Sequence, residues 1–152
     1  MAEWVLKPMK QVTIASRASQ ARKAHDALMP EVAAAGYSGD SQFAIRLALD
    51  EALANAMFHG NGGDPTKNVL VEYEVNNESV YIKIQDEGHG FNPKIIPDPT
   101  LEENLCKPNG RGIMLMKAYM SKVSFDDMGR CVTLIKNRNC KRPVASYPTQ
   151  QD

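Results

Sequence analysis

Residues 68–86 carry the pattern that most restricts the fold. Apolar side chains occupy every second position on both sides of a short turn at residues 76–77. They are Val69, Val71, Tyr73 and Val75 before the turn, and Val80, Ile82 and Ile84 after it. This period of two predicts a β-hairpin with one buried face. One further step of two places Asp86 on the buried face, where a carboxylate needs a partner.

Three other segments show strand-like spacing. They are residues 11–15, 122–125 and 131–136, and residues 126–129 (DDMG) form a turn between the last two. These segments add strands to the hairpin, so the predicted sheet contains strands from both halves of the chain.

Helical spacing predicts helices around the hairpin. A first helix begins after Ser16 or Ser19 and ends by Gly36, and we expect Pro30 to kink or restart it. A second, more apolar helix runs over about residues 41–59 and stops at the glycine-rich residues 60–63. A third helix is expected near Gly112, after a proline-rich stretch.

Length and composition predict one domain. The 152 residues suit a single domain over residues 1–140, followed by a flexible tail at 141–152. No apolar run is long enough for a membrane span, and the start of the chain lacks a secretion signal, so we expect a cytoplasmic protein without a membrane partner. The formal net charge of zero argues against direct nucleic-acid binding.

The cysteines do not indicate a metal site. Cys106, Cys131 and Cys140 are odd in number and have no CxxC spacing, which argues against a disulfide framework and against structural zinc. We therefore expect reduced thiols.

The second predicted helix carries the first chemical motif, DEALAN at residues 50–55. Glu51 and Asn55 are four residues apart and project from one face, with His59 one turn further along. An amide oxygen suits Mg²⁺, and a carboxylate beside a terminal phosphate can accept a proton from an attacking hydroxyl or water. The alternative is that both side chains simply face solvent.

Two glycine motifs follow the hairpin. In DEGHGF (residues 86–91), Asp86 can accept a hydrogen bond from the exocyclic amine of adenine, while Gly88 and Gly90 allow close contact with the ring. GRG at residues 110–112 opens the third helix, so its N–H groups and Arg111 can hold phosphate. Each motif alone could be an ordinary turn, whereas the three in this order predict a nucleotide pocket.

The long stretch between the glycine motifs, about residues 91–110, contains four prolines and no sustained period. A loop of this length within a compact domain is typically functional, and we interpret it as a lid over the pocket. The pocket is not of the Walker type, because no GxxxxGK[ST] sequence occurs.

Across about residues 10–137, these motifs resemble the Bergerat-fold (GHKL, histidine kinase-like) ATPases, and within them the anti-sigma factor serine/threonine kinases. Residues 49–61 (LDEALANAMFHGN) look like the N box of that subfamily, and residues 86–91 and 110–116 look like its two glycine boxes. The resemblance implies an α+β two-layer sandwich with a mixed, mostly antiparallel sheet, helices on one face and an ATP lid.

The resemblance also implies roles for individual residues. Glu51 would be the general base and Asn55 the Mg²⁺ ligand, with ATP as the cofactor. Asp86 would read adenine. The other nucleotide-contacting positions would be His59, Gly88, Gly90, Gly110, Arg111 and Gly112. Many relatives have Thr directly after the glycine of the final hairpin, where this chain has Arg130, so Thr133 would replace it if the strand register allows.

Family members of this kind commonly form homodimers, bind a sigma factor and phosphorylate a STAS-type antagonist. Two alternatives stay open at the level of sequence: a nucleotide-gated interaction module or ATPase without protein-kinase activity, and a histidine-kinase-type phosphotransfer protein. The second would use His25, which is followed by an acid and a proline at phosphoacceptor spacing. Only 25 residues separate His25 from Glu51, too few for a phosphoacceptor hairpin, so we regard this spacing as coincidental.

Overall fold

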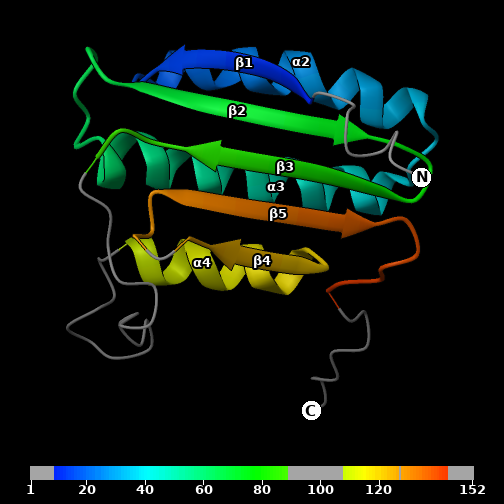
Figure 1. The fold of residues 1–152 in the computed structure, drawn as a ribbon. Coiled ribbons are helices and arrows are strands. Elements are labelled where there is room, and N and C mark those ends of the chain that lie inside the picture. Colours follow the sequence, from blue (N-terminus) through cyan, green and yellow to red (C-terminus); the bar gives the residue numbers. More distant parts are fainter. Residues whose placement is uncertain (1–8, 89–107, 127, 144–152) are drawn as a thin grey trace.

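A five-stranded sheet forms one layer of the fold in the computed structural model, which describes residues 9–88, 108–126 and 128–143. The strand order is β1–β2–β3–β5–β4 (Figure 1). The strands are β1 (Lys10–Ala15), β2 (Asn68–Val75), β3 (Ser79–Gln85), β4 (Lys122–Phe125) and β5 (Cys131–Asn137).

Every neighbouring pair among these strands is antiparallel. The mixed sheet expected from the resemblance therefore has no parallel pair within the described residues. The chain path explains this difference. β3 and β4 run in the same direction, but β5 lies between them and is antiparallel to both (Figure 1).

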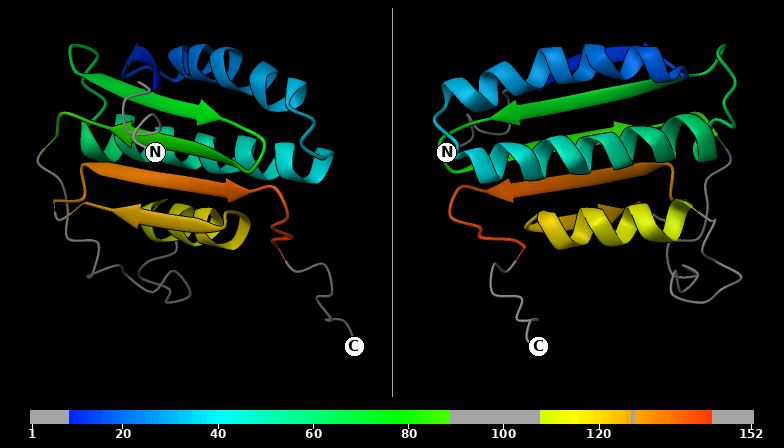
Figure 2. Two further views of the ribbon diagram at one scale, coloured as in Figure 1. Left: turned by 45° about the vertical axis from the view of Figure 1, so that its right-hand side comes forward. Right: turned by 180° about the vertical axis from the view of Figure 1, so that it is seen from behind.

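The helices cover one face of the sheet, which gives the predicted two-layer α+β sandwich (Figure 2). They are α2 (Ala21–Ala34), α3 (Gly39–Ala54) and α4 (Pro108–Tyr119), with a short 3₁₀ turn η1 (Ala18–Gln20) before α2. A π-helical segment, η2 (Asn55–Gly60), continues directly from α3. No helix in the described part of the chain is long and apolar enough to cross a membrane.

The helix boundaries and caps correct three expectations. α2 continues through Pro30 to Ala34, so the predicted restart does not occur, although the proline removes one backbone donor. The N-cap of α3 is Ser38, whose hydroxyl accepts a hydrogen bond from the Ser41 N–H at 3.1 Å, so this helix begins two residues earlier than predicted. Ser16 does not cap α2; its hydroxyl donates to the Lys67 carbonyl instead.

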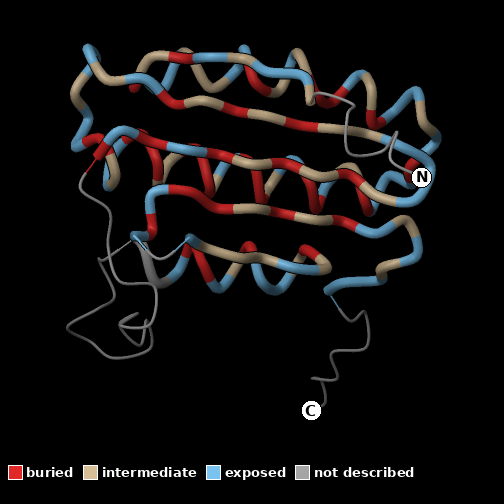
Figure 3. Tube along the Cα trace, in the orientation of Figure 1, coloured by how far each residue is buried: buried red, intermediate tan, exposed pale blue. Residues whose placement is uncertain are grey.

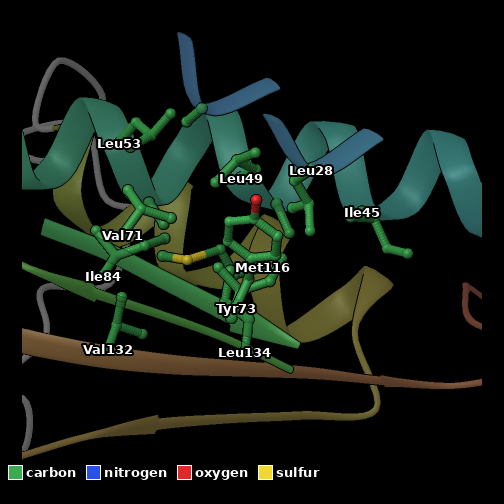
Figure 4. Close-up of a cluster of buried hydrophobic side chains, with 14 of the residues drawn as sticks. Leu28, Ile45, Leu49, Leu53, Val71, Tyr73, Ile84, Met116, Val132 and Leu134 are labelled. Atoms are coloured by element: carbon green, nitrogen blue, oxygen red, sulfur yellow. The ribbon is translucent and has the colours of Figure 1, made fainter. Parts of the chain in front are cut away.

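The core lies between the helices and the inward face of the sheet. Buried residues alternate along β2, β3 and β5, as the period of two predicts (Figure 3). From the sheet they include Val71, Tyr73, Ile84, Val132 and Leu134, and from the helices Leu28, Ile45, Leu49, Leu53 and Met116 (Figure 4). This core fixes the ends of α3 and β3, where the candidate site lies.

The proposed lid and tail fall mostly on residues that are not described. Residues 89–107 and 144–152 lie outside the described part of the chain, as does Gly90. Within the described part, Cys131 and Cys140 are free thiols, as expected. No group of three or more His, Cys, Asp or Glu residues there is placed to hold a metal ion.

Candidate active site

Asp86 anchors the candidate site at the end of β3. It is only 8% exposed, and it accepts a hydrogen bond from the Gly88 N–H at 2.8 Å. Its own N–H donates to the Arg130 carbonyl at 2.9 Å, which ties the end of β3 to the turn before β5. The extension of the hairpin alternation to Asp86 is confirmed, because this carboxylate lies on the buried side.

Two glycines allow the backbone to close around this carboxylate. A Cβ on Gly60 would collide with the Asp86 carboxylate, and a Cβ on Gly88 would collide with the Gly60 carbonyl. The end of η2 and the turn after β3 therefore approach each other more closely than side chains permit. The glycines at 60 and 88 are required here by space rather than by an unusual φ.

Asn61 holds these two segments together. Its side-chain amide donates to Ser16 Oγ at 2.9 Å and to the Asn68 carbonyl at 3.0 Å, and its Oδ1 accepts the Glu87 N–H at 2.7 Å. Asn61 is buried, so these bonds satisfy the donors and the acceptor of its own side-chain amide. The residue fixes the backbone just after Asp86, and sequence reasoning assigned it no role of its own.

A pocket opens beside Asp86 between the helical layer and the sheet. Polar side chains of Asn55, His59 and Asp86 line it. The remaining lining residues are Ala52, Ala56, Gly60, Ile84, Phe125, Gly129, Arg130 and Val132. The pocket thus combines one buried carboxylate with an apolar wall, which suits a flat heterocycle with an amine at its edge.

The π-helical segment η2 shapes this side of the pocket. The Asn61 N–H bonds to the Ala56 carbonyl, five residues earlier, at 2.9 Å. π-helical turns are rare and occur often at functional sites. Here the wider turn carries both Asn55 and His59 into the pocket lining, as their spacing predicted.

Glu51 lies on the same helix one turn earlier, against the start of α4. A Cβ on Gly112 would come within 2.9 Å of Glu51 Oε1 and within 3.6 Å and 3.7 Å of the Asn55 amide atoms. Because Gly112 has no side chain, α4 packs closely against this acid and amide. The first and third sequence motifs therefore meet in space.

Burial changes the protonation of the site. It raises the pKa of the Glu51 carboxyl, and the nearby charge of Asp50 raises it further. Burial also raises the pKa of Asp86, an effect that the Gly88 N–H and the Arg130 charge partly oppose. Burial lowers the pKa of His59. A carboxylate with a raised pKa is better suited to accept a proton than a fully hydrated one.

The other predicted site residues that the structure describes lie on α4 and β5. Gly110 lies within α4, near its start, and Arg111 follows with an exposed side chain. Thr133 pairs with Lys83 and Ser124 on the sheet face opposite Asp86, and the strand alternation separates it from the pocket. The register therefore does not bring Thr133 to Asp86.

Several lining residues were missed by sequence reasoning. Gly60 follows His59 directly and was read only as a helix stop, whereas it makes room for Asp86. Ile84 and Val132 are neighbours across β3 and β5, and both belong to the buried alternation. That alternation was a signal for core residues, but only the strand order shows which core residues reach the pocket.

The structure also shows His25 in a contact between two helices of the sandwich. Its Nε2 lies 2.6 Å from Asp50 Oδ1 and so connects α2 to α3, while its Nδ1 is buried without a hydrogen-bond partner. Within α2, its side chain is mostly covered. This placement agrees with the interpretation of the His25 spacing as coincidental.

Comparison with known proteins decides the family. The model of the histidine kinase-like ATPase domain matches residues 14–136. The chain belongs to this family. Membership of this family implies the use of ATP.

Among curated relatives, this ATPase is similar to the anti-sigma F factors of Bacillus licheniformis and Bacillus subtilis. Each is 29% identical over 103 residues, covering 61% of this chain and 67% of the relative. The serine-protein kinase RsbW of Listeria innocua is 25% identical over 115 residues, covering 71% of this chain and 73% of that protein. The resemblance to anti-sigma kinases is thereby confirmed.

A solved structure has the same fold. The RsbU and RsbW domains of Rv1364c from Mycobacterium tuberculosis match with a TM-score of 0.59 at 18% identity. The match covers 91% of this chain and about a third of that longer chain, 34%. At this identity the similarity bears on the fold alone, and it confirms the two-layer architecture.

Proposed function

We propose that this histidine kinase-like ATPase is an anti-sigma regulatory factor that acts as a protein serine/threonine kinase with ATP and Mg²⁺. Its substrate is a small STAS-type antagonist, and its second partner is a sigma factor. The names of the relatives support this assignment. We further propose that it acts in the cytoplasm as a homodimer, without contacting nucleic acid.

The observation that carries the proposal is the packing of Glu51 and Asn55 against Gly112 at the start of α4. This packing places a proton acceptor and an amide oxygen beside backbone from the second glycine motif, near a pocket that contains a buried carboxylate. Carboxylates with a pKa raised by burial cluster at catalytic sites, which favours a kinase over a pure binding module.

The residues present fit ATP. The Asp86 carboxylate faces a pocket with an apolar wall, and glycines at positions 60 and 88 leave no side chain over it. Asn55 and Glu51 offer oxygen atoms, the ligand type that Mg²⁺ prefers. We assign Asp86 to the adenine amine, and Asn55 to the metal that accompanies the phosphates.

When bound, ATP supplies the γ-phosphoryl group and Mg²⁺ offsets its charge. The chain supplies orientation and proton transfer. Glu51 accepts the proton of the attacking serine or threonine hydroxyl, which its raised pKa favours near neutral pH. Arg111, in the first turns of α4, adds positive charge at the phosphate end of the site.

The experiment uses the purified full chain with Mg²⁺ and γ-labelled ATP in an extract of the source cell. Glu51→Ala is the test variant, and Glu78→Ala, on the turn at the opposite end of the β2–β3 hairpin, is the matched control. We expect an acid-stable label on a small second protein with the wild type and with Glu78→Ala, and its loss with Glu51→Ala.

Other outcomes point to other functions. Acid-labile label on this chain itself would overturn the proposal in favour of histidine chemistry. Nucleotide binding without label on any protein would support an ATPase or a nucleotide-gated binder. Equal labelling by Glu51→Ala and wild type would remove Glu51 from the mechanism.

A further inference from the structure

An arginine lies opposite Asp86 where β3 and β5 meet the pocket. The register of these strands pairs Gln85 with Cys131, so one further step pairs Asp86 with Arg130. The Asp86 N–H donates to the Arg130 carbonyl at 2.9 Å, which shows that the pairing continues through this step. Residues paired in this way project to the same face of a sheet, and both Asp86 and Arg130 line the pocket. A positive charge therefore lies next to the buried carboxylate.

The turn before β5 holds the backbone of Arg130 in place. Its N–H donates to Asp126 Oδ1 at 2.9 Å, and its carbonyl accepts the Asp86 N–H. Gly129, directly before it, has a φ of +73°, in the left-handed region that favours glycine. The Gly129 N–H donates to the Asp126 carbonyl at 3.1 Å. These contacts fix the point at which the Arg130 side chain leaves the backbone.

The Asp86 carboxylate has little other support for its charge. Asp86 is only 8% exposed, and the Gly88 N–H is the one hydrogen-bond donor that the described residues give to its side chain. Arg130 is exposed, and it is the one lysine or arginine among the described residues that line this pocket. Burial disfavours the ionised form of a carboxyl group, so a nearby cation affects whether the group stays ionised.

Other titratable groups also act on Asp86 or line its pocket. They are Asp126, Lys67, His59 and Cys131. Burial raises the pKa of Asp86 and the Asp126 charge raises it further, whereas Arg130 lowers it more than Lys67 does. Burial lowers the pKa of His59, so this imidazole adds little positive charge near neutral pH. Arg130 is thus the strongest of the charges that favour the Asp86 anion.

The charge of Asp86 decides which base edge it can bind. An ionised carboxylate only accepts hydrogen bonds, so it suits the N–H of a 6-amino group. A protonated carboxyl group presents an O–H donor instead and loses the strength of a charge-assisted bond. Any group that keeps Asp86 ionised therefore also selects the base.

We propose that Arg130 is a specificity-determining residue that favours 6-aminopurine nucleotides by keeping Asp86 a hydrogen-bond acceptor. Arg130 acts through Asp86, so it is a positioning residue and not a catalytic one. The inference rests on the proposed function, because it takes ATP as the ligand of this pocket.

The test compares ATP with purine riboside triphosphate, which lacks only the 6-amino group. Calorimetric titration of the full chain with Mg²⁺ at several pH values gives the ratio of the two dissociation constants, which we call the amine preference. Both nucleotides carry the same triphosphate, so the ratio cancels its titration. At neutral pH we expect the wild type to prefer ATP by roughly tenfold or more, as for a hydrogen bond to a charged group. The preference should fall at low pH as Asp86 becomes protonated.

Two charge-removing variants should move this pH dependence in opposite directions. Arg130→Gln should raise the pH of half-maximal amine preference, and at the wild-type midpoint it should lower the preference by about 1.5- to 3-fold, as expected for an exposed charge. Asp126→Asn removes an anion but keeps an oxygen that can accept the Arg130 N–H, so it should lower the midpoint. Lys141→Gln, at an exposed position after the far end of β5, is the control and should leave the midpoint unchanged.

A second measurement needs no nucleotide. Because burial raises the pKa of Asp86 above its ordinary 3.8, the folded protein loses stability as the pH rises through the raised value. Arg130→Gln removes a charge that opposes this rise, so urea denaturation should show that the loss of unfolding free energy extends to higher pH. Salt should shrink the difference from the wild type, because it screens an exposed charge.

The outcomes separate this inference from the kinase assignment. An unmoved midpoint in Arg130→Gln, or shifts of the same direction in Arg130→Gln and Asp126→Asn, would overturn the inference while ATP binding stands. A purely structural role for Arg130 predicts such shifts of one direction. Failure of the wild type to bind either nucleotide would instead overturn the proposed function and the ligand assigned here. Urea denaturation would still report the Arg130–Asp86 pair in that case.

Discussion

Glu51 and Gly112 touch across the junction of α3 and α4: a single methyl group on Gly112 would come within 2.9 Å of Glu51 Oε1. This contact links a carboxylate of the first motif to the helix that begins with the third motif. It makes the position of the proposed base dependent on the absence of a side chain one helix away.

Gly112→Ala should therefore separate catalysis from stability. Alanine is the better helix former by about 1 kcal/mol, and the carboxylate it would meet is the end of a flexible side chain that can move aside. We expect unchanged or higher unfolding free energy in urea, together with a fall in phosphoryl transfer of roughly 10-fold or more as Glu51 is displaced. A matched control is Gly39→Ala, because no atom lies within 4 Å of its added Cβ. Full activity in Gly112→Ala would show that the contact does not position the base.

Gly60→Ala should damage both folding and nucleotide binding. Its new methyl group would collide with the Asp86 carboxylate, which is short, buried and held by the Gly88 N–H. Overpacking of this kind costs about 1–3 kcal/mol. We also expect ATP affinity to fall by roughly 10-fold or more, because a displaced carboxylate loses its hydrogen bond. Urea denaturation and calorimetric titration measure the two effects, again with Gly39→Ala as the control.

Local patterns in the sequence were enough to predict the hairpin and the buried Asp86. The alternation of Val80, Ile82 and Ile84 needs only the period of two, and the structure confirms it. The Glu51–Asn55–His59 spacing likewise needs only helix geometry. The all-antiparallel sheet could not be read this way, because it depends on β5 being inserted between β3 and β4.

Contacts between segments distant in the chain were the other part that sequence could not supply. Thr133 was a reasonable candidate by its distance from Gly129, yet the strand register points it to the face opposite Asp86. Gly60 and Asn61 were visible in the first motif, but their contacts with Asp86 and Glu87 are tertiary. The spacing of residues along the sequence does not indicate such tertiary contacts.

Asn61→Ala should destabilise the protein through the backbone around the site. The change leaves the Glu87 N–H and the Asn68 carbonyl without their side-chain partner. Asn68 and Glu87 are exposed residues, so water can reach the groups that lose their partner. Each lost hydrogen bond costs about 0.5–1.5 kcal/mol, so we expect a loss of roughly 1–3 kcal/mol in urea denaturation. Asn139→Ala, at an exposed position after β5, is the control and should be nearly neutral. A neutral Asn61→Ala would show that water replaces these bonds.

Asp86→Asn should stabilise the nucleotide-free protein while weakening ATP binding. Burial raises the pKa of Asp86 above its ordinary 3.8, so folding favours the protonated acid. The wild type thus loses stability as pH rises from the ordinary value through the raised one, whereas the variant does not. The amide oxygen can still accept the Gly88 N–H. Denaturation at several pH values should show that the unfolding free energy of Asp86→Asn exceeds that of the wild type by an amount that grows as the pH rises. A difference that stays constant with pH would contradict this account.

The fall of the phosphoryl-transfer rate at low pH, the acid limb of the pH–rate profile, should report the pKa of Glu51. Burial and the Asp50 charge raise that pKa above the ordinary 4.5, so the base is lost to protonation at a pH higher than a hydrated glutamate would require. Asp50→Asn removes the charge but keeps an oxygen that can accept from His25, so the limb should move to lower pH with the plateau rate little changed. Asp40→Asn, ten residues earlier on α3, is the charge-matched control and should leave the limb in place. A limb that stays fixed in Asp50→Asn, measured by initial rates across the acid range, would mean that another group controls the protonation step.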